Sequence, residues 1–285
     1  MDIYLLEAII NGLLLGGVLA LLSLGLNLIF GVIDVVWIVY AEIVMSAMYA
    51  VYWLHNYYAW PLFLAFPAAI LIAALIGVLV HMVVIEPILG SAPINQLLAT
   101  GGLLFFLQSL ATLLFGTEFR NLGVRLPVLE LYGLYISFSR LIAFIVALIG
   151  AVALYLFLAR TYLGTSIRAI SQDREIMGLM GVNERRTYVI TSAIGGGLAG
   201  LAACLLVLQY DVHPFIGLTF GPITFMICVL GGLGNMIGGF FAAFIISQII
   251  GIGGYYFSSE AAEVLAFVFF IVMILIRPQG ILGKK

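Results

Sequence analysis

Charged residues are scarce in this sequence. Asp, Glu, Lys and Arg make up only 8% of its 285 residues, whereas 65% are hydrophobic. An average soluble domain has roughly a quarter of its residues charged. A water-soluble fold of this length cannot bury so much apolar side chain, so the composition excludes a soluble globular protein. The net charge of -2, with no cluster of basic residues, also argues against a nucleic-acid partner.

Lysine, histidine and cysteine are nearly absent. The two lysines, Lys284 and Lys285, are adjacent and follow no glycine-rich turn, so the sequence has no Walker A loop that could bind ATP. The three histidines are far apart, and no H-E-x-x-H or G-x-S-x-G stretch exists. We therefore expect no enzyme activity, metal or cofactor. Cys204 and Cys228 lie in apolar runs and are expected to be buried free thiols.

Long apolar runs follow one another along the whole chain. A run of about 20 apolar residues is long enough to cross the bilayer as a helix. The runs predict an all-α, polytopic membrane helix bundle of about nine spans, with eight or ten as alternatives, in one transmembrane domain over residues 1–285. The predicted spans are residues 7–30, 35–53, 61–84, 95–115, 138–160, 187–208, 217–232, 236–253 and 261–277.

The basic residues indicate how the spans are oriented. Five arginines fall between Arg160 and Arg186, and Arg277, Lys284 and Lys285 lie at the end of the sequence. Cytoplasmic loops retain Lys and Arg, so both regions are predicted to be cytoplasmic. Four predicted spans separate the two regions, and an even number of spans returns the chain to the same side of the membrane. Counting back from Arg160 puts the N-terminus and residues 116–137 outside the cell.

The segment 161–186 is polar in a chain that is otherwise poor in charge. Its apolar residues recur every three or four positions, Asp173 is suited to cap a helix start, and Gly181 is suited to end a helix. This pattern predicts two short amphipathic helices. They could form a connector lying on the bilayer surface, or a knob that docks on a cytoplasmic partner.

Several segments resemble one known family of membrane proteins. The segment 168–183 reads RAISQDREIMGLMGVN, and it resembles the cytoplasmic coupling segment of permease subunits of branched-chain amino acid ABC transporters. Residues 11–32, NGLLLGGVLALLSLGLNLIFGV, resemble the first span of that family. Residues 86–109, EPILGSAPINQLLATGGLLFFLQS, resemble its fourth-span entry. GGLGNMIGG from Gly231 and RPQGILG from Arg277 resemble its last two signatures.

The resemblance implies the partners of this chain. Permeases of that family pair with a second, identical or paralogous, permease subunit, dock on cytoplasmic ATPase subunits and receive solute from an external solute-binding protein. It also implies a multi-pass location in the inner (plasma) membrane and import of amino acids. The residues in this segment that would couple ATP hydrolysis to transport are Arg168, Ala169, Asp173, Glu175 and Gly181.

One part of the sequence departs from the family. Residues 37–41, Trp-Ile-Val-Tyr-Ala, stand where the family commonly has Asn-Phe-Ala-His-Gly. The identity of the solute is therefore left open. The alternatives are a branched-chain amino acid, another amino acid, and a small polar solute such as urea or a short amide. Trp37 and Tyr40 are predicted to share one helix face. Together with Asn27 and the intramembrane carboxylate of Glu42, they are the candidate residues of the solute pathway.

A transporter or channel that needs no ATPase is the alternative. Secondary transporters usually carry intramembrane charges that couple transport to an ion gradient, and Glu42 is the only clear carboxylate well inside a predicted span. The sequence therefore favours an ATP-driven permease subunit over a secondary transporter.

Overall fold

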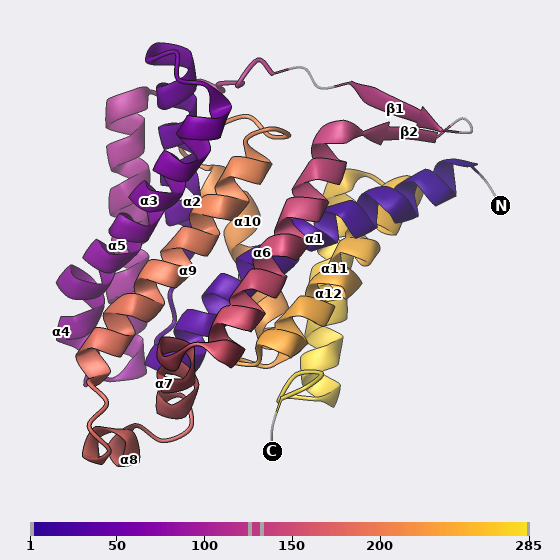
Figure 1. Ribbon diagram of the computed structural model, residues 1–285. Coiled ribbons are helices and arrows are strands. Elements are labelled where there is room, and N and C mark those ends of the chain that lie inside the picture. The colour runs from indigo at the N-terminus through magenta and orange to yellow at the C-terminus, as the bar shows by residue number, and fades with distance from the viewer. Residues whose placement is uncertain (1–2, 125–126, 132–133, 284–285) are drawn as a thin grey trace.

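The computed structural model describes residues 3–124, 127–131 and 134–283, without the side chains of residues 129, 131, 134 and 175. It is a bundle of helices with one small hairpin (Figure 1). The helices are α1 (Ile3–Ile33), α2 (Tyr40–Tyr52), α3 (Leu62–Val80), α4 (Glu86–Ile88), α5 (Pro93–Phe115), α6 (Phe138–Arg160), α7 (Tyr162–Ile170), α8 (Arg174–Leu179), α9 (Glu184–Leu206), α10 (Ile216–Gly231), α11 (Met236–Tyr256) and α12 (Ser259–Ile276). Two π-helical segments, η1 (Trp53–Tyr57) and η2 (His81–Ile85), extend α2 and α3.

The described residues contain seven helices that are long and apolar enough to cross a membrane, fewer than the nine predicted spans. These seven coincide with seven of the predicted runs. The other two runs form shorter helices: α10 has 16 residues, and α2 has 13 residues before η1. The count of nine is therefore not confirmed. α10 ends at Gly231, because the next residue, Gly232, has a φ of +100° and the helix cannot continue there.

The second predicted span is shorter because its first residues are not helical. The chain leaves α1 at Asp34, whose φ of +59° breaks the helix, and it becomes helical again only at Tyr40. The intervening segment 35–39 is rich in β-branched valine and isoleucine, which have lower helix propensity. The apolar run alone could not reveal this break.

α1 lies at the centre of the bundle. It packs against α6, α9, α10 and α11, while α2 lies among α3, α9 and α10. Small residues bring α3 and α9 together: a Cβ added to Gly196 would lie 2.6 Å from the carbonyl oxygen of Ala73. Such small-residue contacts drive helix association in lipid, where no hydrophobic effect operates between helices. α5, α6 and α12 each expose several large apolar side chains.

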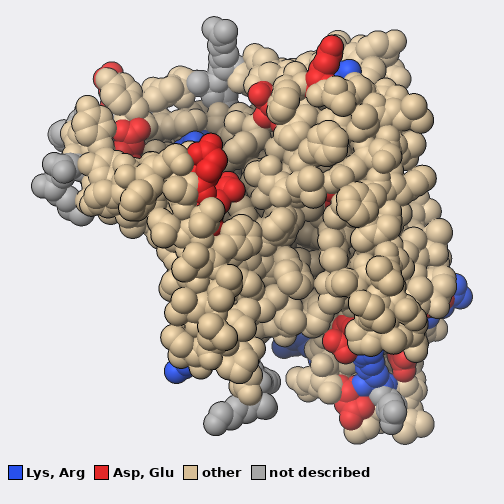
Figure 2. Space-filling view, turned by 180° about the vertical axis from the view of Figure 1, so that it is seen from behind, with Lys and Arg blue, Asp and Glu red and all other residues tan. Residues whose placement is uncertain are grey.

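The two ends of the bundle carry different elements. Figure 1 shows α7, α8 and the C-terminal segment at one end, and the antiparallel hairpin of β1 (Val128–Leu131) and β2 (Leu134–Ser137) at the other. Figure 2 shows charged side chains gathered at both ends, with an uncharged band between them. This is the pattern expected when the band lies in hydrocarbon. Lys284 and Lys285, which contributed to the predicted orientation, lie outside the described residues.

We expect the end with α7 and α8 to be cytoplasmic. Glu118 and Gln172 are exposed at opposite ends, and the native thiols of Cys204 and Cys228 are buried. A membrane-impermeant maleimide applied to intact cells should label Glu118→Cys, and it should label Gln172→Cys only after the cells are opened. Labelling of Gln172→Cys from outside, with Glu118→Cys protected, would reverse the orientation.

Candidate functional site

The segment 161–186 forms the two short helices that the sequence predicts. On α7, Ile167 and Ile170 are buried against the bundle. α8 begins at the Asp173 cap, whose Oδ1 accepts a hydrogen bond from the N–H of Ile176 at 3.0 Å. It ends at Leu179, and Gly181 just beyond it has a φ of +84°, the left-handed conformation that favours glycine. Both terminal signals predicted from the sequence are therefore confirmed.

α8 presents an apolar surface away from the bundle. Ile176, Leu179 and Met180 are 54%, 88% and 74% exposed. The segment at this end projects beyond the long helices (Figure 1). A cluster of exposed large apolar side chains on a projecting elbow is typical of an interaction surface. We call Ile176, Leu179 and Met180 the α8 knob.

Two ion pairs connect this segment to other helices. Arg174 lies 3.8 Å from Asp34, at the break after α1, and Arg185 lies 2.6 Å from Glu86 on α4. Arg168 is exposed on α7, and Ala169 beside it is half-buried. The side chain of Glu175 lies outside the described residues. The sequence gives no local signal for the contact with Asp34, because the two partners are far apart in the chain.

The link between α1 and α2 is irregular backbone inside the protein. Val35, Trp37 and Val39 are at most 1% exposed. The carbonyl of Val36 accepts a hydrogen bond from Thr100 Oγ1 at 3.1 Å, but among the described residues no backbone N–H of 35–39 donates to a protein acceptor. Irregular backbone at membrane depth is tolerated where protein encloses it or where it lines a polar path. The segment therefore offers backbone N–H donors that have no protein acceptor among the described residues.

Glu42 lies just beyond this segment, in the first turn of α2, and is fully buried. Its Oε1 accepts a hydrogen bond from Gln108 Nε2 of α5 at 3.0 Å, while its Oε2 has no hydrogen-bond partner. A Cβ at Gly217 of α10 would clash with this carboxylate, so only glycine leaves it room. Neither ion pair among the described residues includes Glu42. The site therefore suits a ligand that brings a cation or N–H donors.

Trp37 and Tyr40 do not share a helix face, contrary to the prediction. Trp37 precedes α2, whereas Tyr40 begins it. Both side chains are at most 2% exposed, and the Tyr40 hydroxyl donates to the carbonyl of Gly195 on α9 at 3.4 Å. The indole Nε1 of Trp37 is buried without a partner. Tyr40 packs between helices, and Trp37 alone adds an unpaired donor near the irregular segment.

Asn27 holds a turn at the end of the bundle that carries α7 and α8. Its Oδ1 accepts the N–H of Gly234 at 3.1 Å, and its amide lies against Gly239. The same turn is joined to the C-terminal segment, because Ile281 donates its N–H to the carbonyl of Leu230 at 2.7 Å. Asn27 therefore has a structural contact, which is the commonest role of a buried amide between helices.

The sequence profile of a family described as "Branched-chain amino acid transport system / permease component" matches residues 8–277. That range includes Glu42, Gln108 and the segment 161–186. The chain belongs to this family. It is accordingly a multi-pass protein of the inner membrane, and a permease component of a transport system.

Two relatives match almost the whole length of the permease. It is 29% identical over 294 residues to the high-affinity branched-chain amino acid transport system permease protein BraD of Pseudomonas aeruginosa, spanning 98% of this chain and 96% of that protein. It is also 29% identical over 301 residues to the corresponding permease protein LivH of Escherichia coli, spanning 99% and 96%.

A solved structure, PsaBC from Streptococcus pneumoniae in complex with Fab, has a similar fold. Its TM-score is 0.54 at 14% sequence identity, with 94% of this chain and 91% of that chain covered. At this identity the likeness concerns the fold of the permease only.

At the opposite end of the permease, two loops pair with each other. Arg120 and Val212 exchange backbone hydrogen bonds of 2.9 and 2.8 Å, and Asn121 Nδ2 donates to Asp211 Oδ1 at 2.7 Å. Burial lowers the pKa of His213 in the same loop, and the nearby Asp211 opposes that shift. The pairing gives this end an ordered surface.

No metal centre is formed by the described parts of the permease, since no three His, Cys, Asp or Glu side chains gather there. Gln108 is the site residue that sequence reasoning missed. A polar amide in the middle of an apolar run was the available signal, and it was visible at position 108.

We expect removal of the Asn27 amide to destabilise the fold. Asn27→Ala leaves the N–H of Gly234 without its acceptor, which should cost about 1–2 kcal/mol in the free energy of unfolding. Asn95→Ala removes an exposed amide and serves as control. Thermal unfolding of the purified variants in detergent measures the difference. Equal unfolding temperatures for the two variants would contradict the structural role of Asn27.

Proposed function

We propose that this chain is the membrane-spanning subunit of an ATP-driven importer, and that its solute is an amino acid, of the branched-chain type or close to it. Its partners are cytoplasmic ATPase subunits, a second permease subunit and an external solute-binding protein. The observation that carries the proposal is the path of contacts from the α8 knob, through Arg174 and Asp34, to the irregular segment before Glu42.

The α8 knob is the proposed docking point for the ATPase subunit. Its apolar side chains are solvated in the isolated permease, and their burial in a partner would contribute to association. Movement of α8 would be transmitted to Asp34, because Arg174 is in the first turn of α8 and pairs with Asp34. Asp173 and Gly181 fix where α8 begins and ends. They would act as positioning residues for the α8 knob.

The experiment on coupling uses the left-handed turn at Gly181. Gly181→Val should strain this turn by about 1 kcal/mol or more, misplace the α8 knob and uncouple ATP hydrolysis from uptake. Gly181→Asn is the matched control, because asparagine tolerates the left-handed conformation. ATPase activity, subunit retention and solute uptake are measured on complexes reconstituted in lipid. Wild-type behaviour of Gly181→Val would reduce the segment to a connector.

Glu42 is the proposed contact for the solute. An amino acid carries an ammonium group, which could pair with the free Oε2, and a carboxylate, which could accept from the backbone N–H groups of the irregular segment. Urea and short amides bring N–H donors but no full charge. The buried, unpaired carboxylate therefore favours an amino acid over those solutes.

Glu42→Gln tests the solute contact. The amide keeps the size of the side chain but loses the charge. A hydrogen bond to a charged group is worth about 1.5–3 kcal/mol, so the apparent KM for amino acid uptake should rise about ten- to hundredfold. Glu118→Gln, an exposed carboxylate of the opposite end, is the control. An unchanged KM in Glu42→Gln would remove Glu42 from the pathway.

The same preparation separates the proposal from its alternative. Reconstituted permease without ATPase subunits should take up no solute, because its sequence has no Walker A loop with which it could hydrolyse ATP itself. Uptake in their absence, driven by an ion gradient, would instead make the chain a secondary transporter or channel.

A further inference from the structure

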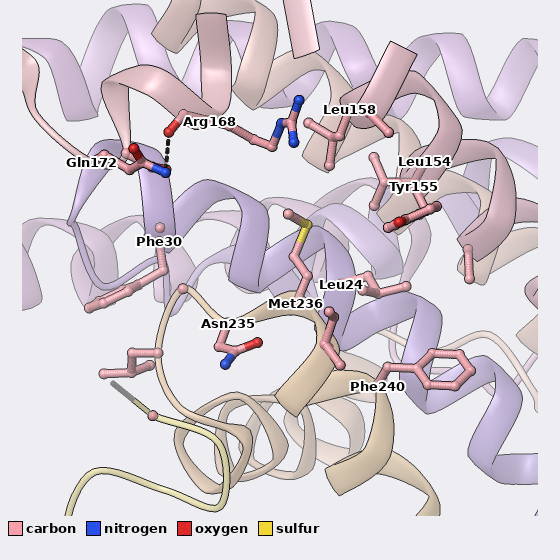
Figure 3. Close-up of a pocket in the computed structure, with 18 of the residues that line it drawn as sticks. Leu24, Phe30, Leu154, Tyr155, Leu158, Arg168, Gln172, Asn235, Met236 and Phe240 are labelled. Atoms are coloured by element: carbon pink, nitrogen blue, oxygen red, sulfur yellow. Dashed lines mark hydrogen bonds between the residues drawn. The ribbon is translucent and has the colours of Figure 1, made fainter. Parts of the chain in front are cut away.

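A cleft of about 960 Å³ lies between α1, α6 and the start of α11. Its walls are largely apolar and include Leu24 of α1, Leu154 of α6 and Phe240 of α11 (Figure 3). Tyr155 and Ile237, also in its lining, are 65% and 58% exposed, so the cleft is open at the side of the bundle. All three helices are long enough to cross the membrane. The cleft therefore faces the bilayer rather than an aqueous compartment.

One end of the cleft is polar and basic. Arg168, in the last turn of α7, extends its guanidinium over the cleft toward Leu158 (Figure 3). Ser171 and Arg174 line the same end. Arg174 is paired with Asp34, but neither ion pair formed by the described residues includes Arg168. The charge of Arg168 is thus available to a ligand.

We propose that this cleft binds an anionic phospholipid of the cytoplasmic leaflet, with the phosphate at Arg168 and an acyl chain along Leu24 and Leu154. The cleft requires a ligand that is apolar along most of its length and negatively charged at one end. The bilayer supplies such a ligand at this depth. A guanidinium forms charge-assisted hydrogen bonds with phosphate, and a basic pocket between helices on the cytoplasmic side suits an anionic headgroup.

This proposal gives Arg168 a different partner from the one that the sequence predicts. The α8 knob points away from the bundle, whereas Arg168 lies over the cleft. A transported solute is a poor occupant, because the lining carboxylate of Asp34 is already paired with Arg174. The lipid site is separate from Glu42, so its failure would leave the transport proposal intact.

The test is native mass spectrometry of the full-length permease, released from nanodiscs that contain equal amounts of phosphatidylglycerol and phosphatidylcholine. Arg168→Gln removes the charge at the cleft. Ala151→Trp fills the cleft from α6, because Ala151 is part of its lining. Arg160→Gln is the matched control, since Arg160 is an exposed arginine at the end of α6 that does not line the cleft.

Arg168→Gln should lower the retained phosphatidylglycerol about fivefold and leave phosphatidylcholine unchanged. Ala151→Trp should lower both, and Arg160→Gln should match the wild type. Equal loss in Arg168→Gln and Arg160→Gln, or no loss in Arg168→Gln, overturns the proposal. Displacement of the lipid by excess inorganic phosphate would make this a free-phosphate site and also overturns it.

Discussion

The absence of water in hydrocarbon constrains this protein more than any other condition. Every backbone N–H and C=O at membrane depth must find a partner within the protein, which is why apolar runs of the sequence become helices. The link between α1 and α2 departs from this rule, and the bundle is arranged to enclose it. α2 is buried along nearly its whole length, among α3, α9 and α10. Small residues on the neighbouring helices allow that close enclosure.

Because protein encloses the irregular segment, a weak contact is enough to change its conformation. The pair between Arg174 and Asp34 is 3.8 Å long and largely exposed, so it adds little to stability. The pair matters because of its position: Asp34 lies where α1 ends and the irregular backbone begins. A partner that holds α8 differently in two states would shift the segment between two arrangements by its difference in affinity for them. The coupling therefore does not require a rigid connection through the whole bundle.

Local patterns in the sequence revealed the features that depend on neighbouring residues. Among the described residues, seven helices that are long and apolar enough to cross a membrane follow from apolar runs, and the limits of α8 follow from Asp173 and Gly181. Features that depend on residues far apart in the sequence could not be predicted from local patterns. The break before Tyr40 lies inside an apolar run, so the second predicted helix is shorter than predicted, and Trp37 and Tyr40 do not share a helix face. The contact of Glu42 joins residues 66 positions apart, which no periodicity encodes.

The turn after α10 has a consequence for how the chain is assembled. Asn235 Nδ2 donates to the carbonyl of Leu282, 47 residues later, and Ile281 is hydrogen-bonded to Leu230. Synthesis therefore delivers one side of this junction long before the other. α12 must insert and return the chain to the same end of the bundle before the junction can close. Until then α10, which has only 16 residues, lacks its hydrogen bond with Ile281. The insertion of α12 therefore completes the anchoring of an earlier helix.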